Sequence, residues 1–148
     1  MGAVRVKVRL TNAVDEVLVQ RGLLKVEEIR SVEADALVDT GAVRTVLPAD
    51  IAARLGLGTF GEEVVQYMDG RTEAVSLIGP VSVRLEGRTT VDEALVLGDE
   101  VLIGQTVLEK LDLLADCQRQ RLIPNLKHPD RAVTYVKRSA ARRSPVLV

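Results

Sequence analysis

Hydrophobic and polar residues alternate along several stretches of the chain, and such alternation is typical of half-buried β-strands. The clearest stretch is 4–10, where Val or Leu at every second position alternates with Arg or Lys. The same period returns at 81–85, and a further strand is expected over 91–97. Another strand, which ends in a buried apolar run, is expected at about 31–38. The pattern therefore predicts a mostly β chain with a meander of short antiparallel strands in its middle.

Three short helices are expected between these strands. The first covers 12–22, where apolar residues recur at helical spacing after the first strand. Pro48 is suited to be the first residue of a second helix, which Gly56 ends. A third helix is expected to begin near Thr106, with this residue as the N-cap and Glu109 as its capping-box partner.

Two hairpins and one domain boundary are also predicted. Asp69-Gly70 joins two extended runs, which is a strong hairpin signal. A second hairpin is expected within 112–124. We expect residues 1–125 to form one domain. Residues 126–148 are expected to form a C-terminal extension, a flexible tail rich in Lys and Arg towards its end.

Composition narrows the class of protein. The chain has 148 residues, of which 47% are hydrophobic and 28% charged, so a single folded domain is expected. A net charge of −1 and an aromatic content of 2% argue against nucleic acid as a partner. Cys117 and His128 are the only residues of their kinds, so no intrachain disulfide and no ordinary zinc site can form, and no metal or cofactor is expected.

The first residues lack the apolar segment of a signal peptide, and the chain contains no apolar run long enough to span a bilayer. We therefore expect no membrane partner and a soluble, cytoplasmic protein.

The strongest candidate for chemistry is Asp39, which follows the apolar run Ala36-Leu37-Val38 and precedes Thr40-Gly41. A carboxylate at the end of a buried strand is costly unless it is paired or hydrogen-bonded, and groups of this kind are frequent at functional sites. The alternative is an ordinary surface turn, in which Gly41 supplies only backbone freedom.

Further motifs follow this one in a set order. They are Thr45-Val46-Leu47-Pro48, the Asp69-Gly70 hairpin, and Val101-Leu102-Ile103-Gly104 before a helix. In this order the chain resembles a retropepsin-like aspartic protease over residues 31–125. Leu55-Gly56-Leu57 is similar to the prokaryotic members in particular. The resemblance implies a closed or partly open β-barrel of the acid-protease type with short helices, one lobe per chain.

The resemblance also implies an activity. Members of this family hydrolyse peptide bonds with two carboxylates that share a proton, and this chain has a single Asp-Thr-Gly. The second carboxylate is therefore expected from a second copy of the chain in a homodimer, which would act on a peptide or protein substrate.

The resemblance assigns roles to individual residues. It implies catalysis by Asp39 together with Thr40, which would lock the two loops, and Gly41, which would contact the substrate. The hairpin would be a flap over the substrate. The implied substrate-binding residues are Ala42, Tyr67, Met68, Asp69, Gly70, Arg71, Ile103 and Gly104.

Two departures from the family pattern leave other functions open. Val43 stands where retroviral members usually have an acid, and Gln105 stands where they usually have a base. A catalytically weak or inactive dimerisation or peptide-binding module with the same fold is one alternative. An unrelated small β-barrel, in which Asp39 is only a turn residue, is another.

Overall fold

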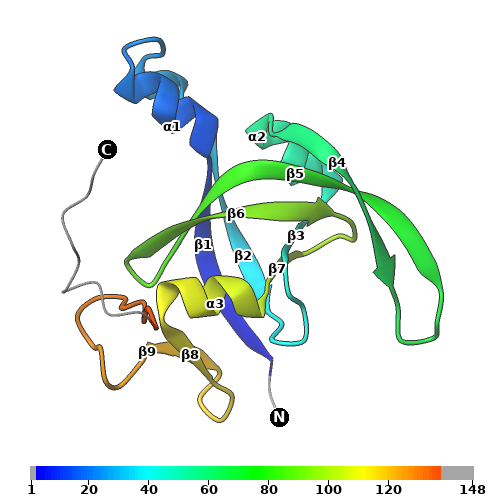
Figure 1. Ribbon diagram of the computed structural model, residues 1–148, viewed down its shortest axis with the longest axis vertical. Coiled ribbons are helices and arrows are strands. Elements are labelled where there is room, and N and C mark those ends of the chain that lie inside the picture. Colours follow the sequence, from blue (N-terminus) through cyan, green and yellow to red (C-terminus); the bar gives the residue numbers. More distant parts are fainter. Residues whose placement is uncertain (1–2, 138–148) are drawn as a thin grey trace.

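The elements of the fold are short, and most of them are strands (Figure 1). The structure, a computed structural model, describes residues 3–137. Along this part of the chain the elements are β1 (Val4–Asn12), α1 (Ala13–Gln20), the 3-10 turn η1 (Val26–Glu28), β2 (Ser31–Val38), β3 (Thr45–Leu47), α2 (Ala49–Leu55), β4 (Gly58–Gln66), β5 (Thr72–Leu85), β6 (Arg88–Val96), β7 (Val101–Ile103), α3 (Gln105–Leu111), β8 (Leu113–Asp116) and β9 (Arg121–Pro124).

Six strands close into a barrel. Neighbouring strands follow the order β1-β2-β7-β3-β6-β5, and residues 81–84 of β5 pair back onto β1. The pairs β2–β7 and β3–β6 are parallel, and the other pairs of the ring are antiparallel. Strand β4 lies outside the ring, because it pairs with β5 alone. The predicted mostly β barrel with short helices is confirmed.

Aliphatic side chains fill the barrel. Leu10, Leu47 and Ile103 are each 0% exposed, and they come from three different strands of the ring. Helix α3 adds Leu108 and Leu111 to the same core. Full burial of such a side chain is worth about 1.5–3 kcal/mol, so a chain with few aromatic residues can still build a stable core.

The strand expected at 31–38 is found with those bounds as β2, and the helix expected within 12–22 is found as α1. Asn12 caps this helix, because its side-chain oxygen accepts a hydrogen bond from the Asp15 amide at 3.1 Å. The Asn12 side chain also donates to the carbonyl of Leu55 at 2.8 Å, which ties α1 to α2. In Figure 1, α1 lies at the top, outside the barrel.

Two predicted helix starts are wrong, that of α2 by one residue and that of α3 by two. Pro48 is the N-cap of α2 and not its first residue. Helix α3 begins at Gln105 with Gly104 as its N-cap, so Thr106 lies inside the first turn and caps nothing. The backbone of Gly104 is extended, and the Gln105 amide donates to the carbonyl of Ala42 at 2.8 Å. A contact with a distant loop therefore sets the start of α3.

The second predicted hairpin is present as β8 and β9, which form a sheet of their own. The expected C-terminal extension lies only partly within the described residues, since 138–148 fall outside them. Residues 126–137 contain no helix or strand, yet they contact the end of α3. The boundary at 125 and the flexibility of the extension stay predictions. Among the helices at residues 3–137, none has the length and apolar character needed to cross a membrane.

Candidate active site

Asp39 lies at the carboxyl end of β2, where the chain leaves the barrel. Its amide donates to the carbonyl of Ile103 on the neighbouring parallel strand β7, at 2.9 Å. One carboxylate oxygen, Oδ1, accepts a hydrogen bond from the Gly41 amide at 2.9 Å. The Asp39 carbonyl accepts from the Ala42 amide at 3.1 Å, which closes the turn. Within residues 3–137 no hydrogen bond engages Oδ2, and the side chain is half-buried, so this oxygen is available for chemistry.

Two glycines allow this loop to fold tightly. A Cβ atom on Gly41 would lie 3.2 Å from Oδ1 of Asp39. A Cβ atom on Gly104 would lie 2.6–2.9 Å from the carbonyl oxygens of Ala42, Val43 and Arg44. Side chains at distances below 3.0 Å cannot be accommodated without movement of the backbone. The loop that carries Asp39 and the start of α3 are therefore packed directly on each other.

The structure thus brings together five of the residues predicted for the site: Asp39, Gly41, Ala42, Ile103 and Gly104. The Ile103 side chain is 0% exposed, so only its backbone carbonyl reaches the loop. Thr40 is exposed and forms no hydrogen bond with the rest of the described chain. Its side chain is accessible to a partner molecule.

The predicted hairpin turn is present between β4 and β5. The Tyr67 amide donates to the Arg71 carbonyl at 2.8 Å, and the Gly70 amide donates to the Tyr67 carbonyl at 2.9 Å. Asp69 accepts hydrogen bonds from the backbone amide and the guanidinium of Arg71, which lower the pKa of its carboxyl group. The hydrogen bond from the Tyr67 hydroxyl to Glu73, 2.6 Å long, raises the pKa of Tyr67.

The hairpin of β4 and β5 projects from the barrel (Figure 1). Figure 1 shows β4 and β5 extending past the barrel on the right of the view, with the tip turned down. The guanidinium of Arg71 lies 5.0 Å from the centre of the Tyr67 ring, which gives the tip a cation–π contact. The Met68 side chain is fully exposed. The tip residues predicted for substrate binding are therefore ordered by contacts among themselves.

Sequence reasoning missed Arg44, which follows the Asp39 loop. Its Nε lies 2.9 Å from Oε1 of Glu63 on β4, and its Nη2 lies 2.8 Å from Oε2 of the same carboxylate. Its Nη1 lies 3.4 Å from Glu93 on β6. The hydrogen bonds to Glu63 raise the pKa of Arg44 above its ordinary value. No local pattern marks this contact, because the partners are far apart in sequence.

A second missed feature lies under the loop. Asp92 is only 4% exposed. It accepts a hydrogen bond from the Thr45 hydroxyl at 2.8 Å and forms an ion pair with Lys110 at 3.2 Å. These residues join β3, β6 and α3. Val43 is exposed and Gln105 donates to Glu109, so neither position carries a buried charge. The charged contact beside the loop is therefore made by Asp92 and Lys110, and not by positions 43 and 105.

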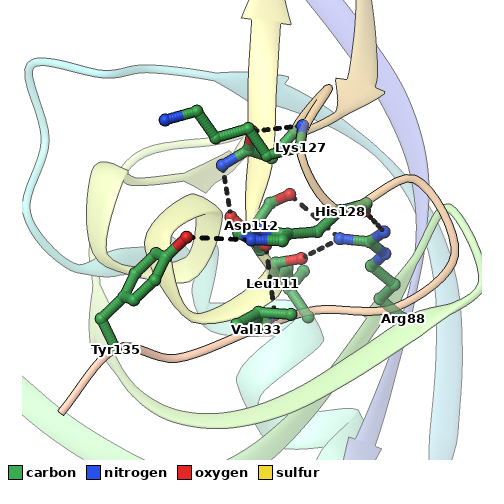
Figure 2. A network of polar contacts seen from close by, with 8 residues as sticks. Arg88, Leu111, Asp112, Lys127, His128, Val133 and Tyr135 are labelled. Atoms are coloured by element: carbon green, nitrogen blue, oxygen red, sulfur yellow. Dashed lines mark hydrogen bonds and ion pairs between the residues drawn. The ribbon is translucent and has the colours of Figure 1, made fainter.

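The single histidine belongs to another network, at the end of α3 (Figure 2). His128 Nδ1 lies 2.6 Å from Oδ2 of Asp112, and the Tyr135 hydroxyl lies 3.0 Å from Nε2. Hydrogen bonds from Asn125, from the Val133 amide and from His128 lower the pKa of Asp112. This network contains none of the residues predicted for the site.

Two further observations bear on ligands. Within the described part of the chain, no cluster of three or more His, Cys, Asp or Glu side chains could hold a metal ion. A surface groove of about 540 Å³ lies between β1 and β9, with Lys7 and Ile123 among its lining residues. Neither the Asp39 loop nor the hairpin tip lines this groove, so it lies apart from the candidate site.

Similarity to known proteins is found with one family model and with a solved structure. A family model described as "gag-polyprotein putative aspartyl protease" matches residues 27–110, more than half of the chain. The matched segment includes β2, the hairpin and most of α3. Among solved structures, the protease of simian foamy virus (mac), determined in solution, is similar with 13% sequence identity and a TM-score of 0.45. The match covers 70% of this chain and 90% of that one. None of the curated proteins matches the chain.

Proposed function

The chain belongs to the gag-polyprotein aspartyl protease family, and on this premise we propose that it is an aspartic endopeptidase whose carboxylate dyad consists of Asp39 from each of two identical chains. The observation that carries the proposal is the half-buried Asp39 carboxylate, with Oδ1 held by the Gly41 amide and Oδ2 without a partner in the described chain. A carboxylate in this state can accept a proton from water.

The dyad needs two chains because the sequence contains one Asp-Thr-Gly only. The nearby acids Glu63 and Glu93 are engaged by Arg44, so they do not offer a second free carboxylate. A two-fold axis beside the exposed Thr40 and Gly41 would set two Asp39 side chains face to face. Two adjacent carboxyl groups do not readily ionise together, so the pair would hold one proton between them.

The reaction then divides between the two carboxyl groups. The ionised Asp39 takes a proton from water, and the resulting hydroxide adds to the peptide carbonyl carbon. The protonated Asp39 of the other chain gives its proton to the carbonyl oxygen. The tetrahedral intermediate then carries two hydroxyl groups on carbon. As the C–N bond breaks, the leaving nitrogen receives the proton that the first Asp39 took from water, and one hydroxyl group of the intermediate returns its proton to the second Asp39. The products are a carboxylic acid and an amine, and the dyad again holds one proton.

The hairpin of β4 and β5 would cover the substrate in this account. A substrate in extended conformation can bind as an added strand, with backbone hydrogen bonds giving affinity. A lid that excludes water also strengthens the electrostatic interactions of the dyad. We assign substrate contacts to the tip residues 67–71 and to Ala42, Ile103 and Gly104, the last three through their backbone at the loop.

A second candidate function is a peptide-binding or assembly module with weak or no proteolysis. It is favoured by the charged tip of the hairpin, where Asp69 and Arg71 form an ion pair with each other. The changes at Val43 and Gln105 point in the same direction, because these positions carry an ion pair in retroviral relatives. In this case the dimer would form and bind peptides without cleaving them.

Cleavage of a mixed peptide library by the wild type and by Asp39→Asn, from pH 3 to pH 7, separates the two functions. We expect Asp39→Asn to lower the cleavage rate by about a hundredfold or more, since it removes the proton-accepting group. A statine-type inhibitor should block peptide cleavage by the wild type. Equal cleavage by both proteins would contradict the proposal, and a stable dimer without cleavage would favour the binding module.

A further inference from the structure

One side-chain contact connects the hairpin to the loop that carries Asp39. Strand β4 lies at the edge of the sheet, and its backbone pairs with β5 alone. Within residues 3–137, the hydrogen bonds between Glu63 and Arg44 are the only ones that a β4 side chain forms. Apart from these bonds, and within the same residues, β4 is hydrogen-bonded to the barrel only through its backbone pairing with β5.

The geometry of this contact is that of a strong ion pair. Two guanidinium nitrogens of Arg44 face the two oxygens of Glu63, at 2.9 and 2.8 Å. Such bidentate pairs fix direction as well as distance. The side chains of Arg44 and Glu63 are 34% and 32% exposed, so solvent screens the pair less than it screens a pair at the open surface. Glu93 holds the guanidinium from the other side.

The backbone of Arg44 is fixed as firmly as its side chain. Its carbonyl oxygen is one of the three that would contact a Cβ on Gly104, and the following residue, Thr45, is wholly buried. The backbone end of the ion pair is therefore anchored in the packed loop. Through this pair, β4 is joined to the segment that carries Asp39.

We propose that Arg44 is a positioning residue, which fixes β4 relative to the loop that carries Asp39 through its ion pair with Glu63. This inference rests on the proposed function, because it gives the hairpin the role of a lid over the substrate. With the pair intact, the hairpin is already held in place when the substrate arrives. With the pair broken, ordering the hairpin over the substrate costs part of the binding energy of the substrate.

Amide hydrogen exchange tests the attachment without any need for activity. We expect Arg44→Gln and Glu63→Gln to speed exchange in residues 60–74 by about three- to tenfold, the range expected for a bidentate ion pair. Exchange in β1 and β2 should not change. Arg5→Gln serves as the matched control, because it breaks an Arg–Glu pair with Glu100 that is remote from the hairpin. Unchanged exchange in the hairpin, or an equal effect of the control, would overturn the proposal.

Kinetics then separate positioning from general stability. Arg44→Gln should raise KM for a peptide substrate by about three- to tenfold while kcat changes less. The double charge reversal Arg44→Glu with Glu63→Arg, made together with Glu93→Gln because Glu93 also contacts Arg44, should restore both the exchange rates and KM, since it rebuilds the pair. Failure of the reversal to rescue, or an equal fall of kcat in all variants, would contradict positioning. If no cleavage depends on Asp39, the proposed function fails, and the exchange data still decide whether the attachment exists.

Discussion

Gly104 lies against three carbonyl oxygens of the loop that carries Asp39, at distances that leave no space for a side chain. The contact explains why a glycine stands at the end of β7, where the backbone is extended and needs no glycine for its own conformation. Space, and not backbone freedom, is the constraint. The contact of Gly104 with the loop thus couples two segments, 39–44 and 103–105, that are far apart in sequence.

Gly104→Ala should therefore be among the most damaging small substitutions in the chain. The added methyl group meets backbone atoms, which cannot move aside as a flexible side chain could, so we expect a loss of about 2–4 kcal/mol in the free energy of unfolding. Gly58→Ala is the matched control, because its Cβ would lie 3.9 Å from the nearest atom. Urea unfolding of both variants measures the difference. Equal stability of the two variants would contradict the contact seen here.

At the scale of elements, the end of α3 binds the segment that follows β9 (Figure 2). Asp112 ends α3 in a left-handed conformation, and its carboxylate accepts hydrogen bonds from Asn125 and from the Val133 amide. Arg88, at the start of β6, donates to the carbonyls of Leu111 and Asp112 and, farther along the chain, of His128. Residues 125–135 are therefore attached to two elements of the barrel by polar contacts.

The contribution of Asp112 should depend on pH in a defined direction. Folding lowers the pKa of this carboxyl group, so its ionised form stabilises the native state above about pH 4. That contribution is lost as the pH falls through the lower pKa of the folded state. Asp112→Asn should be less stable than the wild type at pH 7, and the difference should shrink by pH 3.

Urea midpoints at several pH values test this expectation. Asp35→Asn is the control, because Asp35 pairs with Lys7 at the open surface. A stability difference for Asp112→Asn that is constant from pH 7 to pH 3 would show that the carboxylate does not hold the segment as described.

At the scale of the whole molecule, local patterns predict most helices, strands and turns. Contacts between distant segments determine where α3 begins and which residues surround the candidate site. The strand at 31–38, the Asp69-Gly70 turn and the end of α2 at Gly56 are predictable, because apolar runs and left-handed glycines are local signals. The start of α3 is not, since a loop some sixty residues earlier sets it, about the separation of Ala42 from Gln105.

The residues of the candidate site likewise divide into those that a local motif marks and those that it does not. Asp39 is marked by its own motif and by the apolar run before it. Arg44 and Asp92 carry no such mark, because each depends on a partner from another strand, Glu63 in one case and Thr45 in the other. Tertiary pairing of charged residues has no period along the chain. The motif could therefore be predicted, and its supporting residues could not.

The central claim, a dyad shared between two chains, is tested most directly by mixing subunits. Wild-type protein is equilibrated with a ninefold excess of Asp39→Asn, and cleavage is measured per wild-type chain. If each active site needs Asp39 from both chains, most wild-type chains pair with the variant, and activity should fall to about a tenth. If the activity per wild-type chain stays unchanged at every ratio, one chain is sufficient, and the shared dyad is contradicted.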